Sequence, residues 1–240
     1  MVAHQPGSPY IVAVVHARGG SKRIPLKNIK LLGGIPLVAH IVKAAAQSSL
    51  LHRLLISSDH PEIIRVAKEH GAEAPFVRPP DLSEDVPSEL VTQHAMAFVE
   101  EQDHKKIGIA VTFQPTTPLT TTQDIDACIR ILLDHPELDS AFTAKAVHER
   151  PEWMFRLKGA RGELFTGGSL SGERGVMQSL EPLYIPNGAA YATRRESLFG
   201  QNRLITDNVG LHVMPLERSV DIDEPIDFTL AETLIARQRA

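Results

Sequence analysis

Short runs of aliphatic residues alternate along the chain with stretches in which apolar residues recur at helical spacing. The aliphatic runs predict buried strands at residues 11–15, 54–58, 107–113 and 140–144. The stretches between them predict helices at residues 36–46, 61–70, 89–101 and 122–133. Such alternation is typical of an α/β fold, and we expect a three-layer α/β/α sandwich with a mostly parallel, Rossmann-like sheet.

The alternation stops between about residues 145 and 185, where glycines gather within 159–175. Long irregular insertions in compact domains usually serve as lids, binding loops or oligomer contacts. Regular patterns return at 189–194 and 211–214, and a last helix is predicted at 225–236. We therefore expect one domain over 1–240, with the segment at about 145–185 as an excursion from its sheet.

Composition narrows the class of protein. The 25 Lys and Arg residues are outnumbered by 29 Asp and Glu residues, which argues against a general nucleic-acid surface. The single cysteine, Cys128, excludes an intrachain disulfide and favours a reducing compartment. Residues 1–9 lack the apolar core of a signal peptide, and no apolar run is long enough to span a membrane. We expect a cytoplasmic protein with neither a nucleic-acid nor a membrane partner.

Positive charge is concentrated in the loop that follows the first predicted strand. This loop holds the sequence Gly19-Gly20-Ser21 and four cations, which are Arg18, Lys22, Arg23 and Lys27. Glycines let backbone amides approach an anion closely, and the basic side chains neutralise its charge. The spacing matches neither the dinucleotide-binding nor the Walker pattern. The loop is typical of a phosphate site, although a solvated loop with incidental charge has the same composition.

Three polar segments follow predicted strands at their carboxyl ends. They are residues 18–28, 57–59 and 114–118. Because ligands bind outside the carboxyl ends of the strands in open α/β sheets, we expect these segments to form one site.

Asp221 and Asp223 form an Asp-x-Asp sequence close to Asp227. Alternate residues of an extended segment point the same way, so the first two can present their carboxylates to one cation. Oxygen ligands of this kind suit Mg²⁺, which also binds substrate phosphates. Together with the basic loop, this predicts a nucleoside triphosphate bound with Mg²⁺. The alternative is that Asp223 merely caps the last helix.

Six ordered motifs resemble those of the acylneuraminate cytidylyltransferases, also called CMP-sialic acid synthetases. They are residues 17–22 with Lys27-Asn28, residues 57–59, Arg78-Pro79, and residues 114–119, 187–191 and 221–223. The resemblance covers nearly the whole chain, and residues 23–30 are most similar to the pseudaminic acid branch. It implies a nucleotidyltransferase-type fold, a homodimer joined through the excursion, and transfer of CMP from CTP to an acid sugar with release of pyrophosphate.

The resemblance also implies a role for each motif residue. The nucleotide would be bound by Arg18, Gly19, Gly20, Ser21, Lys22, Lys27, Asn28, Arg78 and Ser88. The sugar would be bound by Gln114, Thr116, Asn187 and Tyr191, and Mg²⁺ by Asp221 and Asp223. Arg18 and Lys27 would stabilise the leaving pyrophosphate, and Asp221 would assist loss of the sugar proton, although a metal-bound carboxylate is a poor base.

Several of these side chains also have purely structural interpretations. Arg78 could lie on the surface before a turn, and Gln114 could satisfy backbone groups at a strand end. Asn187-Gly188 is a common turn sequence, and Tyr191 could simply pack in a strand.

The chain departs from the family pattern on the sugar side. An Arg-Arg-Gln sequence is expected before the Asn-Gly motif, but Val176-Met177-Gln178 stands there with only Arg174 nearby, and Thr120 replaces another expected arginine. Alternatives are therefore a nucleotidyltransferase that uses 3-deoxy-manno-octulosonic acid or GTP, and a non-catalytic nucleotide-sugar-binding homologue. A glycosyltransferase is disfavoured because its Asp-x-Asp would lie near mid-chain.

Overall fold

A mostly parallel sheet forms the centre of the molecule. The computed structural model describes residues 8–172, 176 and 180–239. Within them, six strands lie in the order β10-β6-β9-β5-β1-β4. They are β1 (Ile11–His16), β4 (Arg53–Ser57), β5 (Ile109–Phe113), β6 (Ser140–Ala146), β9 (Tyr184–Arg194) and β10 (Val209–Val213). Only β9 runs antiparallel to its neighbours among these strands, so the predicted sheet type is confirmed.

The aliphatic runs lie in the middle of this sheet because both of its faces are covered. β1 pairs in parallel with β4 on one side and β5 on the other, with Val14 opposite Leu55 and Thr112. Strands buried on both faces are continuously hydrophobic rather than alternating. Residues 11–15 are accordingly buried throughout.

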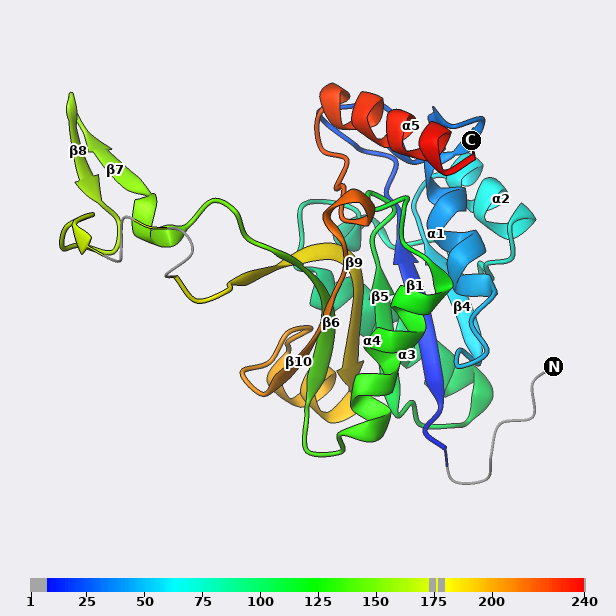
Figure 1. The fold of residues 1–240 in the computed structure, drawn as a ribbon. Coiled ribbons are helices and arrows are strands. Elements are labelled where there is room, and N and C mark those ends of the chain that lie inside the picture. The colour runs from blue at the N-terminus through cyan, green and yellow to red at the C-terminus, as the bar shows by residue number, and fades with distance from the viewer. Residues whose placement is uncertain (1–7, 173–175, 177–179, 240) are drawn as a thin grey trace.

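Helices cover both faces and give the predicted three layers (Figure 1). The helices α1 (Leu37–Ala46), α2 (Pro61–Glu69) and α4 (Thr122–Asp134) share one apolar core with the sheet. On the other face, α3 (Ser88–Asp103) and a π-helical turn at Ser197–Gln201 pack around a second core. The last helix, α5 (Pro225–Arg239), packs over the loop that follows β1 and its short β2 (Leu31–Leu32) and β3 (Ile35–Pro36) strands.

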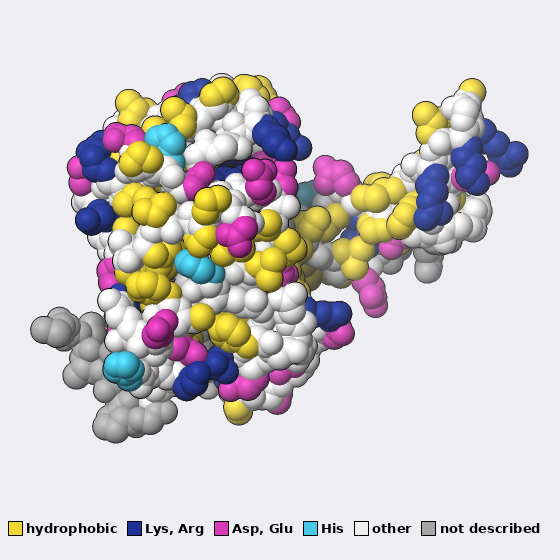
Figure 2. All heavy atoms as spheres, turned by 180° about the vertical axis from the view of Figure 1, so that it is seen from behind, with side chains coloured by type: hydrophobic (Ala, Val, Ile, Leu, Met, Phe, Trp, Pro, Cys, Tyr) yellow, Lys and Arg dark blue, Asp and Glu magenta, His cyan; other side chains and the backbone are white. Residues whose placement is uncertain are grey.

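The segment between β6 and β9 leaves the sheet and extends away from the body (Figure 1). Its far part is an antiparallel hairpin of β7 (Phe155–Lys158) and β8 (Arg161–Leu164). Both strands are short and mostly exposed, so they lack the alternating pattern by which a strand is recognised in sequence. Figure 2 shows apolar side chains along this arm and Lys and Arg side chains toward its far end.

No helix in the described part of the chain is both long enough and apolar enough to cross a bilayer.

Candidate active site

A pocket of about 470 Å³ lies where β1, β4 and β5 end. Its walls bring together residues of two predicted segments, 18–28 and 114–118, whereas residues 57–59 of the third do not line it. The predicted residues that line it are Arg18, Ser21, Lys22, Lys27, Asn28, Arg78, Ser88, Gln114, Thr116 and Asp223. The pocket therefore combines cations from the first loop with polar groups from the end of β5 and a carboxylate from near the C-terminus.

The glycine loop is held by the segment that follows β4. The amide of Gly19 donates a 2.8 Å hydrogen bond to Asp59 Oδ1, so this amide is not free for a phosphate. A Cβ at Gly19 would stand 2.9 Å from Cδ2 of His60, which explains the glycine by packing. Gly20 has open space around it. The sequence identified residues 57–59 as a motif but did not reveal that Asp59 holds the loop.

Two cations of the loop are paired with one carboxylate. Arg18 Nη2 and Lys22 Nζ each lie 2.6 Å from an oxygen of Asp85. Hydrogen bonds from Lys22 and Arg18 lower the pKa of this carboxyl to about 2, so it is charged at neutral pH. Asp85 lines the pocket and thus occupies the groups that would receive an anion. Sequence analysis did not select it.

Lys27 connects the two charged walls of the pocket. Its side chain is only 12% exposed, and its Nζ donates to the carbonyl oxygen of Ile222 at 2.5 Å and lies 3.4 Å from Asp223 Oδ1. Lys27 starts a single 3-10 turn, Lys27–Ile29. In that turn the buried side chain of Asn28 donates to the carbonyl oxygen of Arg18 at 2.9 Å. Asn28 thereby fixes the position of this loop.

The acidic segment is held in place by hydrogen bonds of its backbone. The amide of Ile222 donates to Thr116 O at 2.8 Å. The carboxylate of Asp227 accepts hydrogen bonds from the amides of Asp223 and Glu224, at 2.9 and 2.7 Å. Such a bond from the first turn back to the helix start is the acidic half of a capping box. Asp227, rather than Asp223, therefore serves the start of α5.

Asp221 carries the clearest indication of a cation site. Its Oδ1 is buried and has no hydrogen-bond partner among the described residues. Burial raises the pKa of this carboxyl, and the charge of Asp223 adds to the shift, while the neighbouring Thr116 hydroxyl and the charges of Lys27 and Lys145 act against it. A buried, unpartnered carboxylate oxygen next to a second carboxylate is unfavourable unless a cation is bound.

The donor set fits Mg²⁺ better than it fits a transition metal. No cluster of three or more His, Cys, Asp or Glu side chains suited to a metal occurs in the part of the chain that the structure describes. Mg²⁺ is usually held by one or two carboxylates together with water and substrate phosphates. Asp221 and Asp223 can supply the protein's share of such a site.

The predicted sugar-side residues gather around Gly188, whose φ of +84° favours glycine. A Cβ at this position would stand 3.4 Å from Gln114 Oε1 and 3.7 Å from Asp221 Oδ2. Tyr191 lies opposite Thr112 in the sheet, and burial, then the charge of Asp221, raise the pKa of its hydroxyl. Gln114, Tyr191 and Asp221 thus approach one another next to the pocket.

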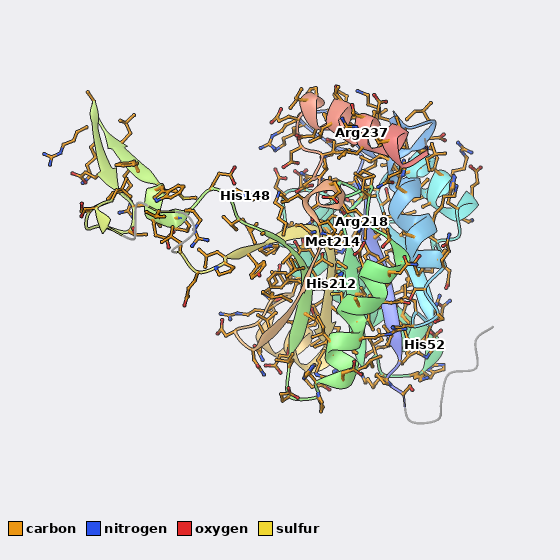
Figure 3. The ribbon with its side chains drawn as sticks, in the orientation of Figure 1. His52, His148, His212, Met214, Arg218 and Arg237 are labelled. Carbon is orange, nitrogen blue, oxygen red and sulfur yellow. The ribbon has the colours of Figure 1, made fainter. Side chains whose placement is uncertain are left out.

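Asn187 differs from the other predicted sugar-side residues. It is 2% exposed, its Nδ2 donates to Ser219 Oγ at 2.9 Å and lies 3.1 Å from Met214 Sδ, and its Oδ1 accepts from the amide of Ala189. Met214 is labelled in Figure 3, where it follows β10 near the base of the arm. Both polar groups of Asn187 are engaged within the protein, so the structure gives it a role in positioning the turn at Gly188.

Arg78 is not the surface residue that the alternative interpretation describes. It is buried, and it donates to the carbonyl oxygen of Ser57 at 2.6 Å and to Ser57 Oγ at 3.0 Å. Burial lowers the pKa of this guanidinium to about 10, so it stays positive at neutral pH. It therefore fixes the end of β4 and adds positive charge to the pocket wall.

The structure describes only some of the residues at which the chain departs from the family pattern. Arg174, Met177 and Gln178 lie outside the described residues. Thr120 is buried and closes a turn by donating to the carbonyl oxygen of Thr117 at 2.8 Å. A long arginine at that buried position would need a different local packing.

Comparison with known proteins matches most of the chain to cytidylyltransferases. A family model described as "Cytidylyltransferase" matches residues 12–157. The chain is 31% identical to a "CMP-N,N'-diacetyllegionaminic acid synthase" of Legionella pneumophila, over 94% of this chain and 96% of that protein. It is 26% identical to "Post-translational flagellin modification protein B" of Campylobacter coli, over 94% of each.

Other relatives are longer or more distant. The chain is 32% identical to "N-acylneuraminate cytidylyltransferase A" of Danio rerio over 96% of its own length, but it spans only 52% of that protein. A solved structure of a CMP:2-keto-3-deoxy-manno-octonic acid synthetase complexed with CTP superposes with a TM-score of 0.67 at 17% identity, over 95% of this chain and 99% of that one. At this identity the likeness shows a shared fold.

Proposed function

We propose, since the chain belongs to the cytidylyltransferase family, that it transfers CMP from CTP to the anomeric hydroxyl of a nonulosonic, sialic-acid-like sugar. Membership of the family makes it a nucleotidyltransferase. The acid-sugar class is proposed from the relatives, because the names of the Legionella and zebrafish proteins refer to legionaminic and neuraminic acids.

The observation that carries this proposal is the position of Lys27. Its ammonium group joins the loop of cations to the distant acidic segment, where it contacts the carbonyl oxygen of Ile222 and lies 3.4 Å from Asp223 Oδ1. Charge of both signs on facing walls suits a triphosphate that is bound together with a divalent cation. A half-buried ammonium group is costly to desolvate, and an uncharged ligand would not offset that cost.

In the proposed reaction the anomeric oxygen attacks the α-phosphorus of CTP. The new oxygen–phosphorus bond forms as the bond to the β-phosphate oxygen breaks, and pyrophosphate leaves. Arg18, Lys22 and Lys27 bind the phosphates, and Arg18 and Lys27 stabilise the negative charge that accumulates on pyrophosphate. Arg18 and Lys22 become available when the triphosphate replaces Asp85.

Asp221 and Asp223 would hold Mg²⁺. When bound, the ion neutralises phosphate charge and orients the triphosphate. Asp221 is also our candidate for accepting the proton of the sugar hydroxyl, through a carboxylate oxygen that does not contact the ion, because a metal-bound carboxylate oxygen is a poor base. Gln114, Thr116 and Tyr191 would contact the sugar, and Asn187 would shape the turn beside it.

The test is product identification with a panel of acid sugars. Purified protein is incubated with Mg²⁺ and CTP, GTP or UTP, together with N-acetylneuraminic, legionaminic, pseudaminic or 3-deoxy-manno-octulosonic acid. Mass spectrometry should detect one CMP-sugar, and chelation of Mg²⁺ should abolish its formation. A product with only 3-deoxy-manno-octulosonic acid or GTP would favour the alternative enzymes, and CTP binding without any product would favour a non-catalytic homologue.

The arm between β6 and β9 supports a homodimer. Leu157 is 77% and Phe155 is 57% exposed on the hairpin, and apolar side chains that project on an arm are stabilised when a second subunit covers them. Light scattering should report a dimer, and Leu157→Asp should shift it toward monomer. Ile226→Asp, at a position that is 71% exposed on α5, is the matched control and should leave the dimer intact.

The cytoplasm is the proposed site of the reaction. The single cysteine, Cys128, is buried in the core as a free thiol, and burial raises its pKa to about 12. An unreactive thiol of this kind agrees with a reducing compartment.

A further inference from the structure

His16 is a neutral polar group in the wall of the pocket that the proposed reaction does not yet use. It is the last residue of β1, is half-buried, and lines the pocket two positions before Arg18. Its Nε2 lies 3.1 Å from the hydroxyl of Thr92 on α3. The ring is therefore held against α3 on one edge.

We assign the proton of His16 to one ring nitrogen from the hydrogen bonds of Thr92. A threonine hydroxyl donates one hydrogen bond and accepts two. The proton of Thr92 goes to the carbonyl oxygen of Ser88 at 3.1 Å, because a carbonyl can only accept. In this assignment the hydroxyl of Thr112, 2.9 Å away, and Nε2 of His16 donate to Thr92. This leaves Nδ1 of His16 without a proton, as an acceptor.

The ring stays uncharged, so Nδ1 keeps its lone pair. Burial, together with the nearby charge of Arg78, lowers the pKa of His16 to about 3. Nδ1 has no hydrogen-bond partner among the described residues. His16 lines the pocket, so a ligand bound there can approach the ring.

The part of the pocket next to His16 suits a nucleobase rather than phosphates. The apolar lining side chains are Leu82, Val86 and Val91, and they come from α3 and the segment before it. Ser88, which also lines the pocket, is one helical turn from Thr92. Flat, uncharged rings bind among apolar side chains with a few placed polar groups, whereas the triphosphate binds at the cations of the loop.

We infer that Nδ1 of His16 accepts a hydrogen bond from the exocyclic amino group of cytosine and thereby selects CTP over UTP. The inference rests on the proposed use of CTP and adds a specificity residue to it. Uracil carries a carbonyl oxygen in place of that amino group. Two acceptors would then face each other in a partly dehydrated site, which is unfavourable because neither can be satisfied.

Two substitutions of His16 distinguish loss of the Nδ1 acceptor from loss of the ring itself. His16→Gln retains a donor that reaches Thr92 but removes the acceptor at Nδ1. His16→Asn places an amide oxygen near the position of Nδ1. Calorimetric titration with the Mg²⁺ complexes of CTP and UTP gives the CTP-to-UTP affinity ratio without needing the sugar. Thermal melting of both variants checks that they fold.

The wild type should prefer CTP. His16→Gln should lower the CTP-to-UTP affinity ratio about tenfold, which is the effect expected for the loss of one hydrogen bond in a partly buried site. His16→Asn should retain most of the preference. A ratio that both variants leave unchanged would overturn the role of His16 while the proposed use of CTP stands. A wild type that binds neither nucleotide would overturn both.

Discussion

Lys27 donates a 2.5 Å hydrogen bond to the carbonyl oxygen of Ile222, although 195 positions separate the two residues in the chain. The bond joins the loop after the first strand of the sheet to the acidic segment before the last helix. Because the carbonyl holds the ammonium group at a fixed point, its charge is oriented before any ligand binds. Charged groups that are fixed in advance stabilise a transition state better than groups that must reorganise.

Replacing Asp85 by asparagine should tighten nucleotide binding. The substitution removes the carboxylate that pairs with Arg18 and Lys22, so a triphosphate no longer has to displace it. The pairs are largely exposed, so we expect a modest fall of about threefold in the Kd for CTP with Mg²⁺, measured by calorimetry.

The effect of Asp85→Asn should shrink as salt is added, because exposed charge pairs are screened. Asp81→Asn changes an exposed carboxylate on the 3-10 turn Pro80–Leu82 of the same segment and is the control. Weaker CTP binding by Asp85→Asn would show instead that Asp85 holds the loop in its binding shape.

Gly188→Ala should impair use of the sugar more than binding of CTP. The residue has a φ of +84°, which costs other residues about 1–2 kcal/mol, and the new methyl group would press against Gln114. We expect kcat/KM for the sugar to fall about tenfold or more, with the Kd for CTP little changed. Gly200→Ala is the control, since a Cβ there meets nothing within 4 Å. Equal losses in sugar use and CTP binding would contradict this separation.

Asp124 is predicted to be important for stability. It is 2% exposed at the start of α4 and accepts hydrogen bonds from Arg218, at 2.8 and 3.1 Å, and from His212 at 3.1 Å. Figure 3 shows His212 and Arg218 beside this helix. Burial acts to raise the pKa of Asp124, but the hydrogen bonds from His212, Arg218 and Thr121 outweigh it and hold the pKa well below its usual range.

Asp124→Asn should lower the free energy of unfolding by about 2 kcal/mol at neutral pH, because it removes the buried charge that accepts hydrogen bonds from Arg218 and His212. A depressed carboxyl pKa stabilises the fold above the unfolded pKa, and that contribution is lost as pH falls through the folded pKa. The difference between wild type and variant in urea unfolding should therefore shrink below about pH 4. Asp207→Asn, at a side chain that is 97% exposed, should have little effect. A difference that is independent of pH would contradict the ionic origin.

The sequence predicted the parts of the site that depend on the sheet. Arg18, Ser57 and Gln114 follow buried aliphatic runs, and parallel strands necessarily bring such residues to one edge. The runs themselves were recognisable because strands that are covered on both faces are apolar throughout.

The parts that were missed depend on contacts between distant residues. Asp85 pairs with cations 63 and 67 positions away, and an exposed aspartate in a loop has no sequence pattern that reveals this. Asn187 is buried because Met214 and Ser219 enclose it, which the common turn sequence Asn-Gly does not indicate. The β7–β8 hairpin was not predicted because neither of its strands has a buried face.

Pyrophosphate release by the wild-type protein and by Lys27→Ala decides whether this pocket carries out the transfer. With Mg²⁺, CTP and the panel of acid sugars, the wild type should release pyrophosphate only when both substrates are present. Lys27→Ala should lower kcat about a hundredfold or more, while Lys43→Ala, an exposed lysine on α1, should match the wild type. A Lys27→Ala protein that releases pyrophosphate at the wild-type rate would contradict the assignment of the active site.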